Sequence, residues 1–168
     1  TGSITTLMAV YACEDPAEIG SVRSARHDYI PLAMGLDAIF AHWGGSHFAL
    51  DKLDAGIMDN VDAMKNPYNA YWQKSGISMP YNGFTSMARL VNAAEKLGYR
   101  LTSRFEGYPH LESSKLNPRV LSGKLTVGYP GHYAVYYQYD SGTNSYKRWR
   151  EGTPEIDKLT NKQVEVSN

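Results

Sequence analysis

A helix near the middle of the chain most constrains how this sequence can fold. Thr85 or Ser86 can cap its start, and Gly98 follows its last turn. Apolar side chains recur between them at helical spacing, at Met87, Leu90, Val91, Ala94 and Leu97. Because these positions form one stripe, the helix must bury that face against another layer, and we expect the layer to be a sheet.

Two segments before this helix are candidate strands of the sheet. Residues Ile4–Cys13 are apolar and rich in Thr, Val and Tyr, which predicts a buried strand. Asp37–Trp43 contains a continuous apolar run, typical of a strand covered on both faces.

The stretch between these two segments predicts a helix over residues 29–34, with Asp28 as its N-cap. Ser46 can cap a further helix over residues 47–54. Residues 59–81 carry turn signals and no clean period, so we expect an irregular packed loop there that could include a short helix.

The character of the chain changes after a loop-like stretch over residues 107–118. Alternating tyrosines predict a hairpin, and the expected strands are 121–127, 132–140, 145–150 and 163–166. We therefore expect an α+β fold. A mixed sheet covered by helices would occupy residues 1–117, and a mostly antiparallel, truncated second domain would occupy residues 118–168.

Composition argues against several classes of protein and site. The 17 basic and 17 acidic side chains cancel, so the basic excess of a nucleic-acid binder is missing. The single cysteine, Cys13, allows neither a disulfide framework nor a thiolate zinc site, and we expect it to be a buried small hydrophobe. No run approaches the ~20 apolar residues of a membrane-spanning helix. We expect no metal and no cofactor.

Two motifs favour an anion site. Gly44-Gly45-Ser46 joins a strand to a helix, and such a turn can present free N–H groups to a phosphate, sulfate or carboxylate. Arg23 and Arg26 flank Ser24 and could clamp one anion. The alternatives are an ordinary strand-to-helix turn and two solvated arginines, and each motif taken alone favours these alternatives.

Further polar residues could join this site. His42 interrupts an apolar strand just before the glycines, and it is either a hydrogen-bonded core histidine or a proton donor facing the turn. Asn82 and Thr85 precede the central helix and become ligand contacts if they face the same pocket. The predicted ligand-binding set is Arg23, Ser24, Arg26, His42, Gly44, Gly45, Ser46, Asn82 and Thr85, with His42 as the candidate catalytic residue.

Several of these segments together resemble a known family. They are Gly20-Ser21-Val22-Arg23-Ser24-Ala25-Arg26, Asp37-Ala38-Ile39, His42-Trp43-Gly44-Gly45-Ser46 and Pro80-Tyr81-Asn82 with Thr85-Ser86. The pattern is similar to the YerB-like lipoprotein family of Gram-positive bacteria, which has no established activity. The resemblance implies an extracytoplasmic protein of the cell envelope, anchored to the membrane by a lipid in the full-length precursor. This chain then looks like a truncated or processed piece of it, without the anchor.

Three functions are compatible with these residues. The first is a binding module for an anionic envelope ligand: a phosphorylated lipid, a wall polymer or a carboxylate. The second is a hydrolase or transferase acting on a phosphoryl or glycosyl bond, with His42 as general acid or base and the glycine turn as an anion hole. The third is a scaffold that binds an envelope protein through the tyrosine-rich hairpin. We rank binding first, because no complete catalytic set accompanies the arginines.

Overall fold

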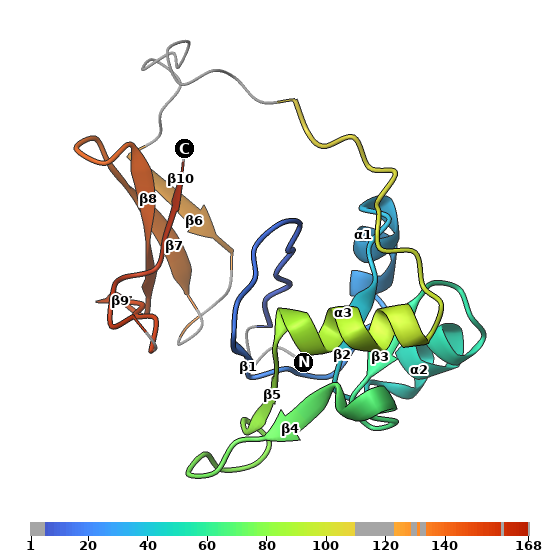
Figure 1. Cartoon of the computed structure of the whole chain (residues 1–168). Coiled ribbons are helices and arrows are strands. Elements are labelled where there is room, and N and C mark those ends of the chain that lie inside the picture. Colours follow the sequence, from blue (N-terminus) through green and yellow to red (C-terminus); the bar gives the residue numbers. More distant parts are fainter. Residues whose placement is uncertain (1–5, 110–122, 129–130, 132–133, 159, 168) are drawn as a thin grey trace. The chain divides into compact units, whose positions relative to one another are not determined.

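The computed structural model describes residues 6–109, 123–128, 131, 134–158 and 160–167. These residues fall into two compact units, which are described separately: Thr6–Tyr108, and the part of the chain from Pro109 onward. Figure 1 labels their helices and strands. The predicted boundary between residues 117 and 118 lies outside the described residues.

The N-terminal unit combines short strands with helices. A three-stranded antiparallel sheet has the order β1-β5-β4, and a separate parallel pair is formed by β2 and β3. The elements are β1 (Ile19–Gly20), α1 (Tyr29–Gly35), β2 (Phe40–His42), α2 (His47–Asp54), β3 (Asn60–Asp62), the 3-10 helix η1 (Pro67–Asn69), β4 (Tyr71–Gln73), β5 (Gly83–Thr85) and α3 (Met87–Lys96).

The extended segment after β1 joins these two sheets. On one side, the Val22 N–H donates to the Gly83 carbonyl over 2.8 Å. On the other side, the Arg23 carbonyl accepts from the Trp43 N–H over 3.0 Å, and the Ala25 N–H donates to the Gly44 carbonyl over 2.8 Å. Backbone bonds therefore fix this segment on both edges, and with it the positions from which its side chains extend.

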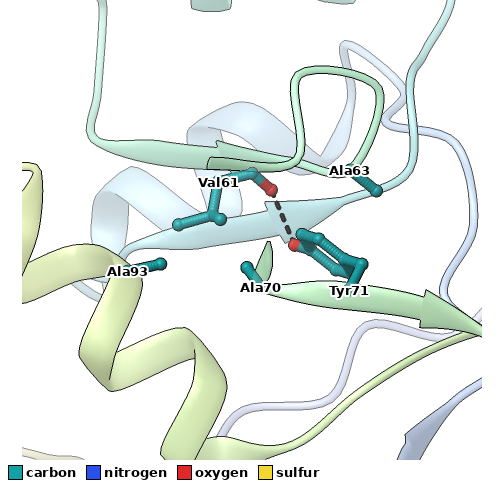
Figure 2. Close-up of a cluster of buried hydrophobic side chains, with 5 residues drawn as sticks. All are labelled: Val61, Ala63, Ala70, Tyr71 and Ala93. Carbon is teal, nitrogen blue, oxygen red and sulfur yellow. Dashed lines mark hydrogen bonds between the residues drawn. The ribbon is translucent and has the colours of Figure 1, made fainter. Parts of the chain in front are cut away.

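The core lies between β3, β4 and α3. Figure 2 shows its central cluster, made of Val61, Ala63, Ala70, Tyr71 and Ala93. The Tyr71 hydroxyl donates to the Val61 carbonyl over 2.7 Å, as the dashed line marks. Burial raises the pKa of Tyr71 well above its usual range, so the hydroxyl keeps the proton with which it donates. A second cluster packs α1 and α2 against Ala25 and contains Ala25, Ile30, Ala49 and Leu53.

The central helix is confirmed with its caps. α3 spans Met87–Lys96, the Ser86 hydroxyl accepts from the Arg89 N–H, and Gly98 follows with φ +75°. Its buried face is narrower than predicted, since Ala93 and Ala94 are buried whereas Leu97 is 37% exposed. The helix packs on β3 through Ala93 and Val61 (Figure 2).

Removing the cap of this helix gives a first test. We expect Ser86→Ala to lower the free energy of unfolding by about 1 kcal/mol, because the Arg89 N–H loses its acceptor at the helix start. Urea denaturation followed by circular dichroism measures the change. Ser75→Ala, in the exposed loop between β4 and β5, is the control and should stay within about 0.5 kcal/mol of wild type. Equal effects of the two substitutions would contradict the capping role.

The C-terminal unit is an antiparallel sheet, as predicted. Its strand order is β10-β8-β7-β6, and β9 pairs with β8. The strands are β6 (Lys124–Val127), β7 (Val135–Asp140), β8 (Ser145–Arg150), β9 (Thr153–Pro154) and β10 (Glu165–Ser167). Tyr136 and Trp149 stack across β7 and β8, with ring centroids 5.8 Å apart. The predicted strand residues 121–122 and 132–133 lie outside the described part. The two units together confirm the α+β class.

One prediction about local structure was wrong, and another was incomplete. No strand forms over residues 6–13, where Leu7 and Val10 are 70% and 57% exposed and Cys13 is exposed too. β-forming residues alone do not make a strand, and no described strand pairs with this segment. Residues 59–81 contain the short helix η1, which the prediction allowed, and also the strands β3 and β4, which it missed because three residues leave no period to detect.

Candidate functional site

The structure brings the two predicted motifs side by side. Ala25 forms a parallel bridge with Gly45, and its carbonyl accepts from the Ser46 N–H over 3.1 Å. Arg23 and Trp43 are joined by the backbone bond described above. The arginine segment and the glycine turn therefore form one structural unit, although residue 25 and residue 45 lie far apart in the sequence.

The amides of the glycine turn are largely occupied within the protein. The Gly44 N–H donates to a carboxylate oxygen of Asp62 over 2.9 Å, and the Ser46 N–H donates to the Ala25 carbonyl. The Ser46 side chain caps α2 by accepting from the Ala49 N–H. A Cβ on Gly45 would lie 3.1 Å from both the Cβ and the carbonyl oxygen of Ala25. The glycines thus allow a close backbone approach, and Gly44 has the positive φ of +59° that favours glycine.

His42 lies in the core, and each of its ring nitrogens is within hydrogen-bonding distance of a protein oxygen. Its side chain is 1% exposed. Nδ1 is 2.8 Å from the Gly44 carbonyl oxygen, and Nε2 is 3.1 Å from Oδ1 of Asn60. A carboxylate oxygen of Asp62 lies 3.7 Å from Nδ1. Of the two interpretations of His42, the geometry therefore fits the hydrogen-bonded core histidine, because a general acid or base needs a free nitrogen within reach of substrate.

Two further predicted residues also make internal contacts. Thr85 is fully buried, and its hydroxyl donates to the Ala70 carbonyl over 2.8 Å. Arg26 is half-buried, and its Nη1 donates to the neighbouring Ala25 carbonyl over 3.1 Å. Neither residue lines the pocket described next.

A pocket of about 110 Å³ opens beside the arginine segment. Three of the predicted residues line it: Arg23, Ser24 and Asn82. It is bounded by the segment after β1, the residue after β2, the end of β4, and the loop and first residue of β5. The lining residues are Val22, Arg23, Ser24, Trp43, Gln73, Met79, Pro80, Asn82 and Gly83.

The Arg23 side chain is oriented by the loop between β4 and β5. Its Nη1 donates to the Pro80 carbonyl over 2.6 Å, and its guanidinium carbon lies 4.9 Å from the centre of the Tyr81 ring. An arginine has five N–H donors, so this contact leaves most of them for a ligand. The guanidinium is thereby held in place at the pocket before any ligand arrives.

Trp43 forms a rigid wall of the pocket. Its ring lies across Gly83, where a Cβ would be only 2.4 Å from the ring carbon Cε3. The ring also contacts Tyr71 in an edge-to-face arrangement, with centroids 5.8 Å apart. Gln73 lies opposite Gly83 in the sheet register. The carboxamides of Gln73 and Asn82 have no hydrogen-bond partner among the described residues.

Sequence reasoning missed several lining residues. Trp43 stands inside the His-Trp-Gly-Gly-Ser motif, so its position was a usable signal. Gln73 gave none, since it belongs to β4, a strand too short to predict. Among the lining residues Arg23 carries the only charge, and none is acidic. Within the described ranges, the structure holds no group of three or more metal-ligating side chains and no helix long and apolar enough to cross a membrane.

Comparison with known proteins identifies relatives of this chain. Residues 1–100 match the family model described as "Protein of unknown function (DUF3048) N-terminal domain". The chain is 32% identical over 171 residues to "Putative lipoprotein YerB" of Bacillus subtilis (strain 168), covering 99% of this chain and 51% of that protein. It also matches the crystal structure of the Bacillus subtilis YerB protein, with a TM-score of 0.74 and 29% identity over 90% of this chain and 51% of the other.

The chain thus spans about half the length of the relatives that it matches. The family match covers most of the N-terminal unit, including both predicted motifs and the pocket. The predicted resemblance to the YerB-like proteins is confirmed by all three comparisons. The chain belongs to the DUF3048 family, the family of YerB.

Proposed function

We propose that the N-terminal unit is a binding module for an anionic ligand and that the pocket beside Arg23 is its site. The observation that carries the proposal is the pre-oriented guanidinium of Arg23 on a pocket without acidic lining residues. Ser24 and Asn82 add polar groups at the same place. A fixed cation that is only partly solvated attracts an anion more strongly than a mobile surface arginine does.

The same geometry favours binding over catalysis. His42, the candidate acid or base, is buried, faces protein oxygens with both ring nitrogens and does not line the pocket. The amides of Gly44 and Ser46, the candidate anion hole, already donate to Asp62 and Ala25. A charge that develops in a transition state could therefore bind these two amides only after their internal hydrogen bonds break.

We also extend the location implied by the relative's name to this chain. As part of a lipid-anchored envelope protein, the module would meet ligands of the cell envelope: a phosphorylated lipid, a wall polymer, a carboxylate or an envelope protein. Radiolabelled palmitate fed to cells that produce the full-length protein tests the anchor. Incorporation into the protein supports the location, and a fully soluble, unlabelled protein in the cytoplasmic fraction would refute it.

Substitution of Arg23 tests the anion site. We expect Arg23→Gln to reduce affinity for small anions about tenfold or more, because a charged hydrogen-bonding partner is lost. The measurement is an NMR titration of the ¹⁵N-labelled protein with sodium acetate and with sodium sulfate, followed at the indole N–H of Trp43 and the side-chain amides of Asn82 and Gln73.

Arg89→Gln is a closely matched control. Arg89 also donates through Nη1 to a backbone carbonyl, that of Asn69, over 2.6 Å, and its guanidinium carbon also lies 4.9 Å from an aromatic ring, that of Trp72. It does not line the pocket. Loss of binding in the Arg23 variant alone supports the site, and the proposal fails if neither anion perturbs the pocket resonances of the wild type.

A further inference from the structure

The charge of the pocket limits the charge of its ligand. Arg23 supplies one positive charge, and no acidic residue is present among the lining residues. A planar guanidinium pairs with one carboxylate through two parallel N–H···O bonds. Protein phosphate sites usually combine several cations or add the free amides of a helix N-terminus. The first residues of α2 do not line this pocket, so a singly charged carboxylate fits it better than a phosphate.

Two carboxamides beside the arginine can recognise an amide group. Gln73 is the last residue of β4, and Asn82 directly precedes β5. The backbone carbonyl of Asn82 accepts from the Lys74 N–H, which leaves its side chain for other contacts. Each carboxamide offers a donor and an acceptor, which is the complement of the C=O and N–H of a peptide group. Because both have no partner among the described residues, they can bond to a ligand without breaking an internal contact.

The remaining lining is apolar. Val22, Trp43, Met79 and Pro80 provide it, and Met79 is 75% exposed. A flexible thioether of this kind adapts its shape to different apolar groups. The pocket volume of about 110 Å³ is several times the roughly 10–15 Å³ that a single water molecule needs, so the pocket has room for a small group such as the end of a peptide.

We infer that the pocket takes the C-terminal end of a peptide. Arg23 pairs with the terminal carboxylate, Gln73 and Asn82 bond to the last peptide group, and the apolar wall holds a small apolar side chain. This inference rests on the proposed function and narrows it, since it names a carboxylate with an amide close by as the ligand chemistry. Capture of a terminal carboxylate is an established mode of peptide recognition.

A matched pair of small peptides tests this inference. The probes are N-acetyl-Ala-Ala with a free carboxylate and the same peptide with a C-terminal amide, and sodium acetate is the reference. NMR titrations report the dissociation constants from the Trp43 indole, Gln73 and Asn82 signals. We expect the peptide acid to bind about tenfold or more tightly than either its amide or acetate, because only the acid engages the arginine, the carboxamides and the apolar wall together.

Two variants sharpen the test. Arg23→Lys retains the charge without the planar fork and should weaken the peptide acid severalfold, whereas Arg89→Gln should leave it unchanged. Equal binding of the acid and amide, or of wild type and Arg23→Lys, would overturn the inference. If acetate or sulfate binds at Arg23 and the peptide acid binds no more tightly, the inference fails while the proposed anion site stands. If no anion perturbs the pocket, both fail.

Discussion

Replacing His42 with alanine is expected to lower the free energy of unfolding by about 3 kcal/mol, the largest effect that we predict for a single polar residue. The substitution removes a fully buried ring that packs 5.4 Å from Phe40. It also removes the ring contact of the Asn60 side-chain oxygen and one of the two contacts of the Gly44 carbonyl, which keeps the Ala25 N–H. Urea denaturation of wild type and variant measures the difference.

His47→Ala serves as the control for this prediction. His47 is an exposed first-turn residue of α2, so its removal should change stability by no more than about 0.5 kcal/mol. If the His42 variant were as stable as the His47 variant, the core role of His42 would be wrong. Because His42 does not line the pocket, we also expect the folded fraction of the His42 variant to bind anions with the affinity of wild type.

Replacing Gly83 with alanine is expected to destabilise the protein by about 2–3 kcal/mol and to close the pocket. A Cβ at this buried position would lie 2.4 Å from the Trp43 ring, well inside contact distance. The ring cannot yield freely, since it is rigid and packed edge-on against Tyr71. Either Trp43 or β5 must shift, and both border the ligand site. The variant should therefore lose both stability and binding.

Gly35→Ala is the matched control. Gly35 is the last residue of α1, has no positive φ, and nothing lies within 4 Å of a Cβ placed there. Alanine at such a helical position is expected to be neutral or to stabilise by up to about 1 kcal/mol. Thermal unfolding and the acetate titration are measured on both variants. If Gly83→Ala keeps the stability and the acetate affinity of Gly35→Ala, the assigned packing of Trp43 on Gly83 is wrong.

Elements held by interactions between residues close in the sequence could be predicted, whereas elements that need a distant partner could not. α2 and α3 start at Ser46 and Ser86, whose hydroxyls bond to backbone three residues later, so the sequence alone could reveal them. Strand formation depends on a partner. Residues 6–13 have β-forming composition but pair with no described strand, whereas β3 and β4 are three residues each and pair well.

The candidate site shows the same limit. The arginine and glycine motifs were predicted to meet, and their segments are indeed neighbours through Ala25. Whether the amides of the turn are free was not predictable, because Asp62, which binds the Gly44 N–H, comes from β3. Successive side chains of a strand point to opposite faces. His42, the last residue of β2, is therefore buried, whereas the next residue, Trp43, lines the pocket.

The most direct test of the central claim is a crystal structure of the protein soaked with N-acetyl-Ala-Ala or, failing occupancy, with sodium acetate. We expect ordered carboxylate density within hydrogen-bond reach of the Arg23 guanidinium, between Trp43 and Asn82. Density at the start of α2 instead, against the amides of Gly45 and Ser46, would contradict it. So would a pocket that remains empty of either ligand at concentrations where binding to the protein is measurable in solution.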